Sequence, residues 1–152
     1  MARAPFQVLI IPYIIEEEEI KYGIFKRSDR VVWQFISGGG EGNEIPIEAA
    51  IRERFEEAKI AKDIKIFKLD AVATVPAEIF CEAYRKNWGE NCYVIPEYAF
   101  AFELGNNKIE ISEEHLEYKF VSYDEAKKLL KYDSNRTAMT ELRARILKKD
   151  LY

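Results

Sequence analysis

Three glutamates, Glu53, Glu56 and Glu57, are spaced so that a helix through them would carry their carboxylates on one face. Like charges at this i, i+3, i+4 spacing repel by roughly a few tenths of a kcal/mol per pair, and one cation, Arg52, stands at i, i+4 to Glu56 to offset them. Such a face is often only solvated surface. Carboxylate oxygens are also the ligands that Mg²⁺ prefers, so the same face is a candidate metal site.

A glycine-rich segment precedes these glutamates. Residues 37–43 contain glycines at 38, 39, 40 and 42, break the periodicity on either side, and therefore predict a loop. Glycines allow close backbone approach and leave N–H groups available to an anion. Because protein-bound Mg²⁺ usually shares its ligands with substrate phosphates, a carboxylate cluster beside such a loop favours a metal–polyphosphate complex over a solvated face.

The helix that positions the carboxylates is predicted to run from Pro46 to Ala58. Pro46 suits the first turn, where its missing N–H is no loss, and Glu48 suits the positive helix end. At 100° per residue, one apolar stripe is predicted to face the core, namely Ile47, Ile51, Phe55 and Ala58.

The rest of the chain is rich in strand patterns. Strands are predicted over 6–15, 21–27, 31–36, 64–75, 92–104 and 118–121. The first two form a hairpin whose turn is the acidic run 16–19. Helices are predicted over 123–130 and 134–148, the second capped by Ser134, whereas 76–91 shows no clear pattern. Mixed strands around a central helix predict a single α/β or α+β domain over residues 1–152.

The composition of the chain excludes several classes of partner and site. The chain is 48% hydrophobic with a net charge of −4 and no block dense in Lys and Arg, so long nucleic acid is not an expected partner. The apolar run 8–15 is too short to span a bilayer, and no membrane association is expected. Two cysteines, Cys81 and Cys92, with one histidine, exclude a Cys/His zinc site and are predicted to be reduced thiols of a cytoplasmic protein.

The spacing of the polar residues resembles the Nudix box. Gly38 is followed after five residues by Glu44 and after seven more by Arg52-Glu53-Arg54-Phe55-Glu56-Glu57-Ala58-Lys59-Ile60. All the fixed polar positions of the 23-residue pattern match. Arg54 replaces an aliphatic residue and Lys59 replaces a glycine, so local packing and the end of the helix are predicted to differ from the family pattern.

The resemblance implies an α/β/α sandwich with a mixed central sheet and hydrolysis of a nucleoside diphosphate linked to another group. It implies Mg²⁺ as cofactor, with Mn²⁺ as an alternative, and a small nucleoside-phosphate-type substrate. Arg52 would orient the glutamates, Glu44 would brace the loop, and the metal ligands would be Glu53, Glu56, Glu57 and the carbonyl of Gly38.

Three further segments resemble the dihydroneopterin triphosphate pyrophosphatase branch, also described as dATP pyrophosphohydrolases. These are 25–27 with 32–34, 112–119 and 134–136. Glu114 would complete the metal site or act as general base, and His115 would orient its loop. The candidate substrate contacts, each with an alternative role as solvated strand end, core aromatic or helix cap, are Lys26, Arg27, Trp33, Gly39, Asn135 and Arg136.

The expected reaction converts a (deoxy)nucleoside triphosphate or dihydroneopterin triphosphate to monophosphate and pyrophosphate, catalysed by a monomer or homodimer. One alternative is hydrolysis of dinucleoside polyphosphates or RNA 5′ ends, because Trp33-Gln34-Phe35 before the glycines also suits that branch. A second is a nucleotide-sensing Nudix module without catalysis. Such modules typically lose box glutamates, whereas Glu53, Glu56 and Glu57 are all present here.

Overall fold

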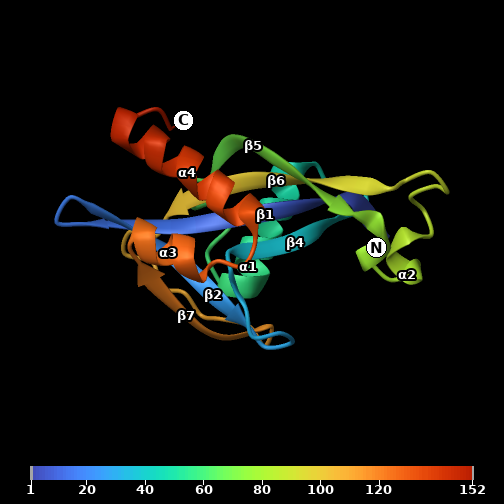
Figure 1. Cartoon of the computed structure of the whole chain (residues 1–152), viewed down its shortest axis with the longest axis horizontal. Helices are drawn as coiled ribbons and strands as arrows, with labels where there is room; N and C mark the ends of the chain where they lie inside the picture. Colours follow the sequence, from blue (N-terminus) through green and yellow to red (C-terminus); the bar gives the residue numbers. More distant parts are fainter. Residues whose placement is uncertain (1, 152) are drawn as a thin grey trace.

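The computed structural model describes residues 2–151. Within them, a seven-stranded mixed sheet lies between α1 on one face and α3 and α4 on the other (Figure 1). The strands are β1 (Arg3–Glu16), β2 (Glu19–Arg27), β3 (Trp33–Gln34), β4 (Ile36–Glu41), β5 (Phe67–Pro76), β6 (Val94–Glu103) and β7 (His115–Val121). The helices are α1 (Pro46–Ala58), α2 (Glu82–Arg85), α3 (Tyr123–Leu129) and α4 (Asp133–Lys148), with a 3₁₀ turn η1 (Ala77–Ile79). The expected α/β/α sandwich is confirmed.

Strand β1 is the centre of the sheet. The strand order is β3-β2-β1-β6-β5, with β4 also paired to β1 and β7 to β2. Only β1 and β6 pair in parallel; the other pairs described are antiparallel. Side chains of β1 alternate between the two cores: Leu9 and Ile11 face α4, and Val8 and Ile10 face α1. Burial on both faces explains the continuous apolar run seen in the sequence.

The predicted hairpin between β1 and β2 is confirmed. Its two-residue turn consists of Glu17 and Glu18, which have φ values of 50° and 68°. Positive φ at both central residues is the geometry that fits the right-handed twist of the flanking strands.

The predicted loop over 37–43 is wrong for residues 37–41, and only Gly42 and Asn43 form a turn. Residues 36–41 form β4, which pairs antiparallel with β1. A β-carbon on Gly39 would lie 1.8 Å from Nε of Arg3, and one on Gly40 would lie 2.2 Å from the ring of Phe6. The glycines are therefore needed for space around a strand, because neighbouring side chains cross directly over the backbone.

Helix α1 has the predicted bounds, but its buried face differs from the prediction. Ile47 and Phe55 are 37% and 41% exposed, whereas the buried positions are Ala49, Ala50, Arg54, Glu57 and Ala58. Ala49, Ala50 and Ala58 join the core cluster that contains Val8 and Ile10 of β1, so small side chains of the helix face the sheet.

The two departures from the Nudix box have separate explanations. Arg54 is fully buried, donates a hydrogen bond from Nη2 to the Ile64 carbonyl at 2.8 Å, and lies 5.0 Å from the ring centre of Phe102. Lys59 ends α1 with φ 57° and ψ 35°, the left-handed conformation. The predicted change in helix ending is therefore wrong, because a lysine here adopts the conformation that glycine would favour.

Smaller features complete the fold. Helix α4 begins one residue earlier than predicted, with Tyr132 and not Ser134 at the N-cap. Residues 76–91 fold as η1 and α2 near the N-terminal end of β1 (Figure 1). Cys81 and Cys92 are unpaired, as predicted. In the described part of the chain, every helix is too short or too polar to cross a membrane.

Candidate active site

The carboxylate of Glu53 reaches the sheet edge at β4. A β-carbon on Gly38 would lie 2.2 Å from Cδ of Glu53, so this approach exists only because residue 38 is glycine. Burial raises the pKa of Glu53, and hydrogen bonding to Arg52 lowers it in part. The helix and the glycine strand thus hold a desolvated carboxylate at one fixed place.

Arg52 connects β4 to the acidic face of α1. Its guanidinium donates to both carboxylate oxygens of Glu44 at 2.8 and 2.9 Å, to Glu53 at 2.9 Å and to Glu56 at 3.2 Å. Its Nη2 also donates to the Gly39 carbonyl at 2.8 Å. Glu44 in turn accepts from the backbone N–H of Glu41 at 2.8 Å. The Arg52 fork is satisfied on every side, which immobilises Glu53 relative to the glycine strand.

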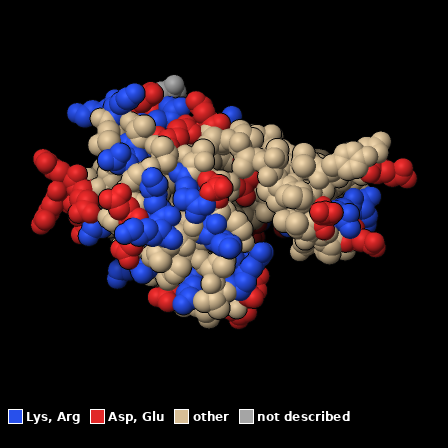
Figure 2. Space-filling view, viewed as in Figure 1, with Lys and Arg blue, Asp and Glu red and all other residues tan. Residues whose placement is uncertain are grey.

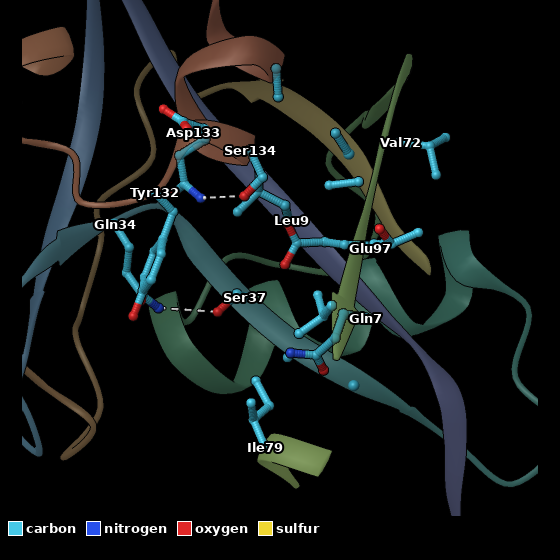
Figure 3. A pocket seen from close by; sticks show the side chains of 18 of the residues that line it. Gln7, Leu9, Gln34, Ser37, Val72, Ile79, Glu97, Tyr132, Asp133 and Ser134 are labelled. Carbon is cyan, nitrogen blue, oxygen red and sulfur yellow. Dashed lines mark hydrogen bonds between the residues drawn. The ribbon is translucent and has the colours of Figure 1, made fainter. Parts of the chain in front are cut away.

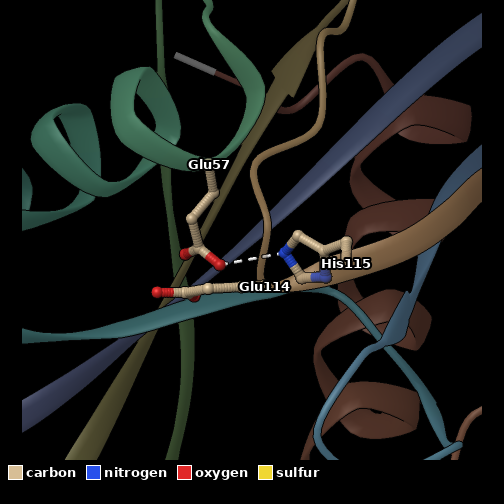
Figure 4. Close-up of side chains that lie close together, drawn as sticks. All are labelled: Glu57, Glu114 and His115. Atoms are coloured by element: carbon tan, nitrogen blue, oxygen red, sulfur yellow. Dashed lines mark hydrogen bonds and ion pairs between the residues drawn. The ribbon is translucent and has the colours of Figure 1, made fainter.

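Glu57 is buried and touches the only histidine of the chain (Figure 4). Nε2 of His115 lies 2.9 Å from Oε1 of Glu57, and the imidazole ring packs 5.1 Å from that of Phe25. Burial raises the pKa of Glu57, and the nearby carboxylates of Glu53 and Glu114 raise it further. The imidazole therefore fixes the orientation of a carboxylate that is costly to ionise without a cation.

Glu114 brings a third carboxylate to this point from the segment before β7. Potential ligand atoms of Glu57, Glu114 and His115 all lie within 4.8 Å of one another. The backbone carbonyl of Glu114 accepts from the Ser28 N–H at 2.9 Å, which attaches this segment to the end of β2. Among residues 2–151, Oε2 of Glu57 is a buried oxygen without a hydrogen-bond partner. A buried, unpartnered carboxylate oxygen beside further carboxylates fits a divalent cation.

Of these carboxylates, Glu53 and Glu114 line a cavity of about 950 Å³, whereas Glu56 and Glu57 are not among its lining residues. Its walls are formed by residues of β1, β4, β5, β6 and the start of α4, which are far apart in the sequence (Figure 3). The predicted site residues that line it are Arg27, Gly38, Gly39, Glu53, Glu114 and Asn135. This volume is in the range of sites for small molecules.

Residues 18–142 match the family model of the NUDIX domain. The chain belongs to the Nudix family. It is 28% identical over 142 residues to the dihydroneopterin triphosphate diphosphatase of Escherichia coli K12, covering 91% of this chain and 92% of that protein.

Solved Nudix structures share the fold. A NUDIX hydrolase from Listeria monocytogenes is 41% identical, with a TM-score of 0.88 over 97% of this chain and 98% of that one. The dihydroneopterin triphosphate pyrophosphohydrolase of E. coli is 24% identical in the structural alignment, with a TM-score of 0.71 over 91% and 94% of the two chains.

Three predicted substrate contacts of this Nudix chain do not line the cavity, namely Lys26, Trp33 and Arg136. Lys26 pairs with Glu117 at 3.8 Å and lies 5.9 Å from the ring centre of Trp33. Arg136 donates to the Leu130 carbonyl and to Asp133, at the start of its own helix. Their contacts are structural ones.

Asn135 lines the cavity of the Nudix fold but also has a structural contact. Its Oδ1 accepts a hydrogen bond from the buried N–H of Phe35 at 2.9 Å. This bond fixes the start of α4 against the segment that leads into β4. Asn135 therefore shapes the cavity wall whether or not it touches a ligand.

Sequence patterns did not identify several residues that line the cavity of this Nudix protein: Arg3, Gln7, Arg30, Glu97 and Tyr132. Arg3 lies over two aromatic rings from the segment without a clear pattern, 5.5 Å from the centre of Phe80 and 4.8 Å from that of Tyr84. The isolated Glu97 within an apolar strand was an available signal, because a carboxylate at a buried strand position requires a reason.

Proposed function

We propose that this Nudix hydrolase uses Mg²⁺ to hydrolyse a phosphoanhydride bond of a nucleoside triphosphate or dihydroneopterin triphosphate, releasing the monophosphate and pyrophosphate. The observation that carries the proposal is the grouping of Glu57 with Glu114, which lines the cavity together with Glu53, and the buried oxygen of Glu57 that has no hydrogen-bond partner among the described residues. Burial raises the cost of ionising Glu53 and Glu57, and the exposed Glu114 adds a further negative charge, so a dication would stabilise the three carboxylates together.

The proposed ligands are supported by different parts of the fold. Arg52 holds Glu53 and His115 holds Glu57, so both carboxylates are oriented before any ligand arrives. Glu56, whose side chain is 54% exposed, and the carbonyl of Gly38 are the outlying members of the proposed ligand set. When bound, Mg²⁺ offsets charge on phosphate oxygens and lowers the pKa of a coordinated water. Glu114 is exposed to the cavity and is our candidate to accept the proton from the attacking water.

Basic side chains border the cavity where phosphates would lie. Arg27 and Arg30 both line it, and Arg27 is held by Asp29 through hydrogen bonds of 2.8 and 2.9 Å. In the space-filling view, a group of basic side chains lies in the middle of the molecule, beside a hollow whose surface is mostly uncharged (Figure 2). A ligand with one anionic end and one uncharged end matches this distribution. The similarity to dihydroneopterin triphosphate diphosphatases supports the same substrate type.

The proposal is tested by measuring pyrophosphate release from purified protein with Mg²⁺. The screen covers nucleoside triphosphates, dihydroneopterin triphosphate, diadenosine polyphosphates and nucleotide sugars. We expect turnover of triphosphates, and complete loss when EDTA removes the metal. Turnover of diadenosine polyphosphates alone would overturn the substrate type, and no turnover of any of these with Mg²⁺ or Mn²⁺ would overturn the reaction.

The variant Glu57→Gln separates a catalytic cluster from a structural one. We expect kcat/KM to fall by roughly 100-fold or more, because groups that stabilise transition-state charge typically contribute that much. The free energy of unfolding, measured in urea, should stay near or above that of the wild type, because the amide relieves carboxylate repulsion and can still bond to His115.

The matched control is Glu103→Gln, an exposed glutamate of β6 that is not among the residues lining the cavity. This variant should leave kcat/KM and the free energy of unfolding unchanged. If Glu57→Gln unfolds the protein while Glu103→Gln does not, the cluster is structural and the assignment of the site is wrong.

A further inference from the structure

The cavity extends from the carboxylate cluster across the sheet toward β5. Four positions lie side by side on this face through the strand register: Gly39 pairs with Gln7, Gln7 with Glu97, and Glu97 with Ala73. Neighbouring strands are about 4.8 Å apart, so the backbone of Glu97 is roughly 10 Å from that of Gly39. All four line the cavity. A ligand whose phosphates lie at the β4 edge would therefore place its other end near Glu97.

Glu97 is a carboxylate with few partners. Its side chain reaches into the middle of the cavity, next to Ser134 at the start of α4 (Figure 3). No Lys or Arg within residues 2–151 forms an ion pair with it, and burial raises its pKa while hydrogen bonding with Ser134 lowers it in part. A half-buried carboxylate with one hydroxyl partner has acceptor capacity left for a ligand.

Apolar side chains form part of the cavity wall around Glu97. Leu9 and Ala99 form a buried floor between the strands. Val72 and Ile79 line the same space and are 58% and 63% exposed, which is unusual for large aliphatic side chains that face a cavity. Aliphatic side chains beside the carboxylate of Glu97 suit a flat, uncharged ring that is oriented by one polar edge.

We propose that Glu97 is the specificity-determining residue of the site and binds the edge that guanine and pterin rings share, which consists of a ring N–H and the adjacent 2-amino group. This inference rests on the proposed function, because it assigns the ring end of the same substrate. The two oxygens of Glu97 accept one hydrogen bond from the ring N–H and one from the adjacent amino group. Both donors lie side by side on this edge, as a carboxylate requires.

Other bases fit this arrangement poorly. Adenine presents a ring nitrogen acceptor beside its amino group, and the ring N–H of thymine stands between two carbonyl oxygens. Each would direct a lone pair at an oxygen of Glu97, so the carboxylate selects against these rings as well as for guanine and pterin. The cost of burying Glu97 is offset only when two N–H donors meet it.

The test compares dGTP with dITP, whose hypoxanthine ring lacks only the 2-amino group. For the wild type, we expect kcat/KM to be about tenfold or more higher for dGTP, because one hydrogen bond to a charged acceptor is lost with dITP. Most of this difference should lie in KM. The ratio alone tests the proposal without any variant, and dATP and dCTP should be poorer substrates than dGTP.

The variant Glu97→Gln should remove this preference. The glutamine amide directs an N–H donor at one of the two ring donors. The ratio of kcat/KM for dGTP to that for dITP should therefore fall to about one, with dITP turnover little changed. Glu103→Gln on the same strand should keep the wild-type ratio. Dihydroneopterin triphosphate is measured in parallel. Loss of its turnover in Glu97→Gln supports the proposal that Glu97 binds the edge shared by the two rings. The kcat/KM of the wild type for this substrate relative to dGTP shows which ring it prefers.

The outcomes separate this inference from the proposed function. Equal turnover of dGTP, dITP and dATP by the wild type would overturn the role of Glu97 and leave the hydrolase intact. If no triphosphate is hydrolysed, the proposed function fails, and calorimetric binding of GMP against IMP still tests Glu97. Equal affinity for GMP and IMP in the wild type would overturn the inference.

Discussion

Gly38 contributes to the candidate site because it has no side chain. Because it has no β-carbon, the carboxylate of Glu53 can lie against the backbone of β4, where Arg52 holds it at 2.9 Å. The sequence placed this glycine in a loop and predicted that it allows close backbone approach. The structure places residue 38 in a regular strand, where the group that approaches closely is the side chain of Glu53.

Gly38→Ala should therefore damage the site more than the fold. Its β-carbon would displace the carboxylate of Glu53, which lies at the cavity, so we expect kcat/KM with Mg²⁺ to fall by roughly tenfold or more. Gly40→Ala is the control, because its β-carbon meets the ring of Phe6 on the same face. That variant should lower the free energy of unfolding and leave activity per folded molecule close to wild type. Equal activity losses in both variants would contradict this distinction.

Among the elements, the β1–β2 hairpin carries the clearest local conflict. Glu17 and Glu18 both adopt positive φ, which is unfavourable for residues other than Gly, Asn and Asp. Glu16 and Glu19 also pair directly across the strands with like charges, and only Lys21, 3.9 Å from Glu16, opposes them. The hairpin is held by its packed strands, not by its turn.

Glu18→Gly should stabilise the protein. Glycine removes the strain of positive φ and one negative charge, so we expect the free energy of unfolding to rise by about 0.5–1 kcal/mol in urea denaturation. Glu16→Gly removes the same charge from a strand position that needs no positive φ, and it should destabilise. A stabilising Glu16→Gly would show that charge repulsion, and not backbone geometry, dominates at this turn.

At the scale of the whole molecule, α4 is joined to the cavity wall by Glu141. The pairing of β5 with β6 is irregular between Lys68 and Val72. The carboxylate of Glu141 accepts the N–H groups of Asp70 and Ala71 there, at 2.6 and 2.7 Å, and also accepts from Arg145 at 2.7 Å. The C-terminal helix thus completes the hydrogen bonding of a strand that lines the cavity.

Glu141→Ala should reduce stability by roughly 1–3 kcal/mol, because two strand N–H groups lose their acceptor. Leu147→Ala, at a largely exposed position of the same helix, should change it by no more than about 0.5 kcal/mol. Both are measured as free energies of unfolding. A similar small effect for both variants would show that water replaces the carboxylate at no cost.

The stabilisation by Glu141 should also depend on pH. Burial raises the pKa of Glu141, but hydrogen bonds from the backbone of Asp70 and from Arg145 outweigh this, so the folded-state pKa lies below the ordinary value of 4.5 for a glutamate. The contribution is therefore fully present above about pH 4.5 and is lost as pH falls through the lower folded-state pKa. The stability difference between wild type and Glu141→Ala should shrink over that acidic range.

The sequence by itself determined the local structure and the chemical type of the site. Helix α1 has the predicted bounds, because Pro46, Glu48 and the end of the apolar stripe at Ala58 are local signals. The spacing of Gly38, Glu44, Arg52, Glu53 and Glu57 predicted the Nudix family, and it also accounts for the bonds that Arg52 makes.

Only the tertiary structure decided which residues share the cavity. The glycine segment became strand β4 because its ladder partner is the distant β1, and no local pattern reports such a partner. Parallel pairing of β1 with β6 places Glu97 beside Gln7, ninety positions earlier in the chain. Trp33 does not line the cavity, and its ring lies against Lys26 and Lys119. Strand register depends on long-range packing of both sheet faces, so the ring end of the site could not be predicted from residue spacing.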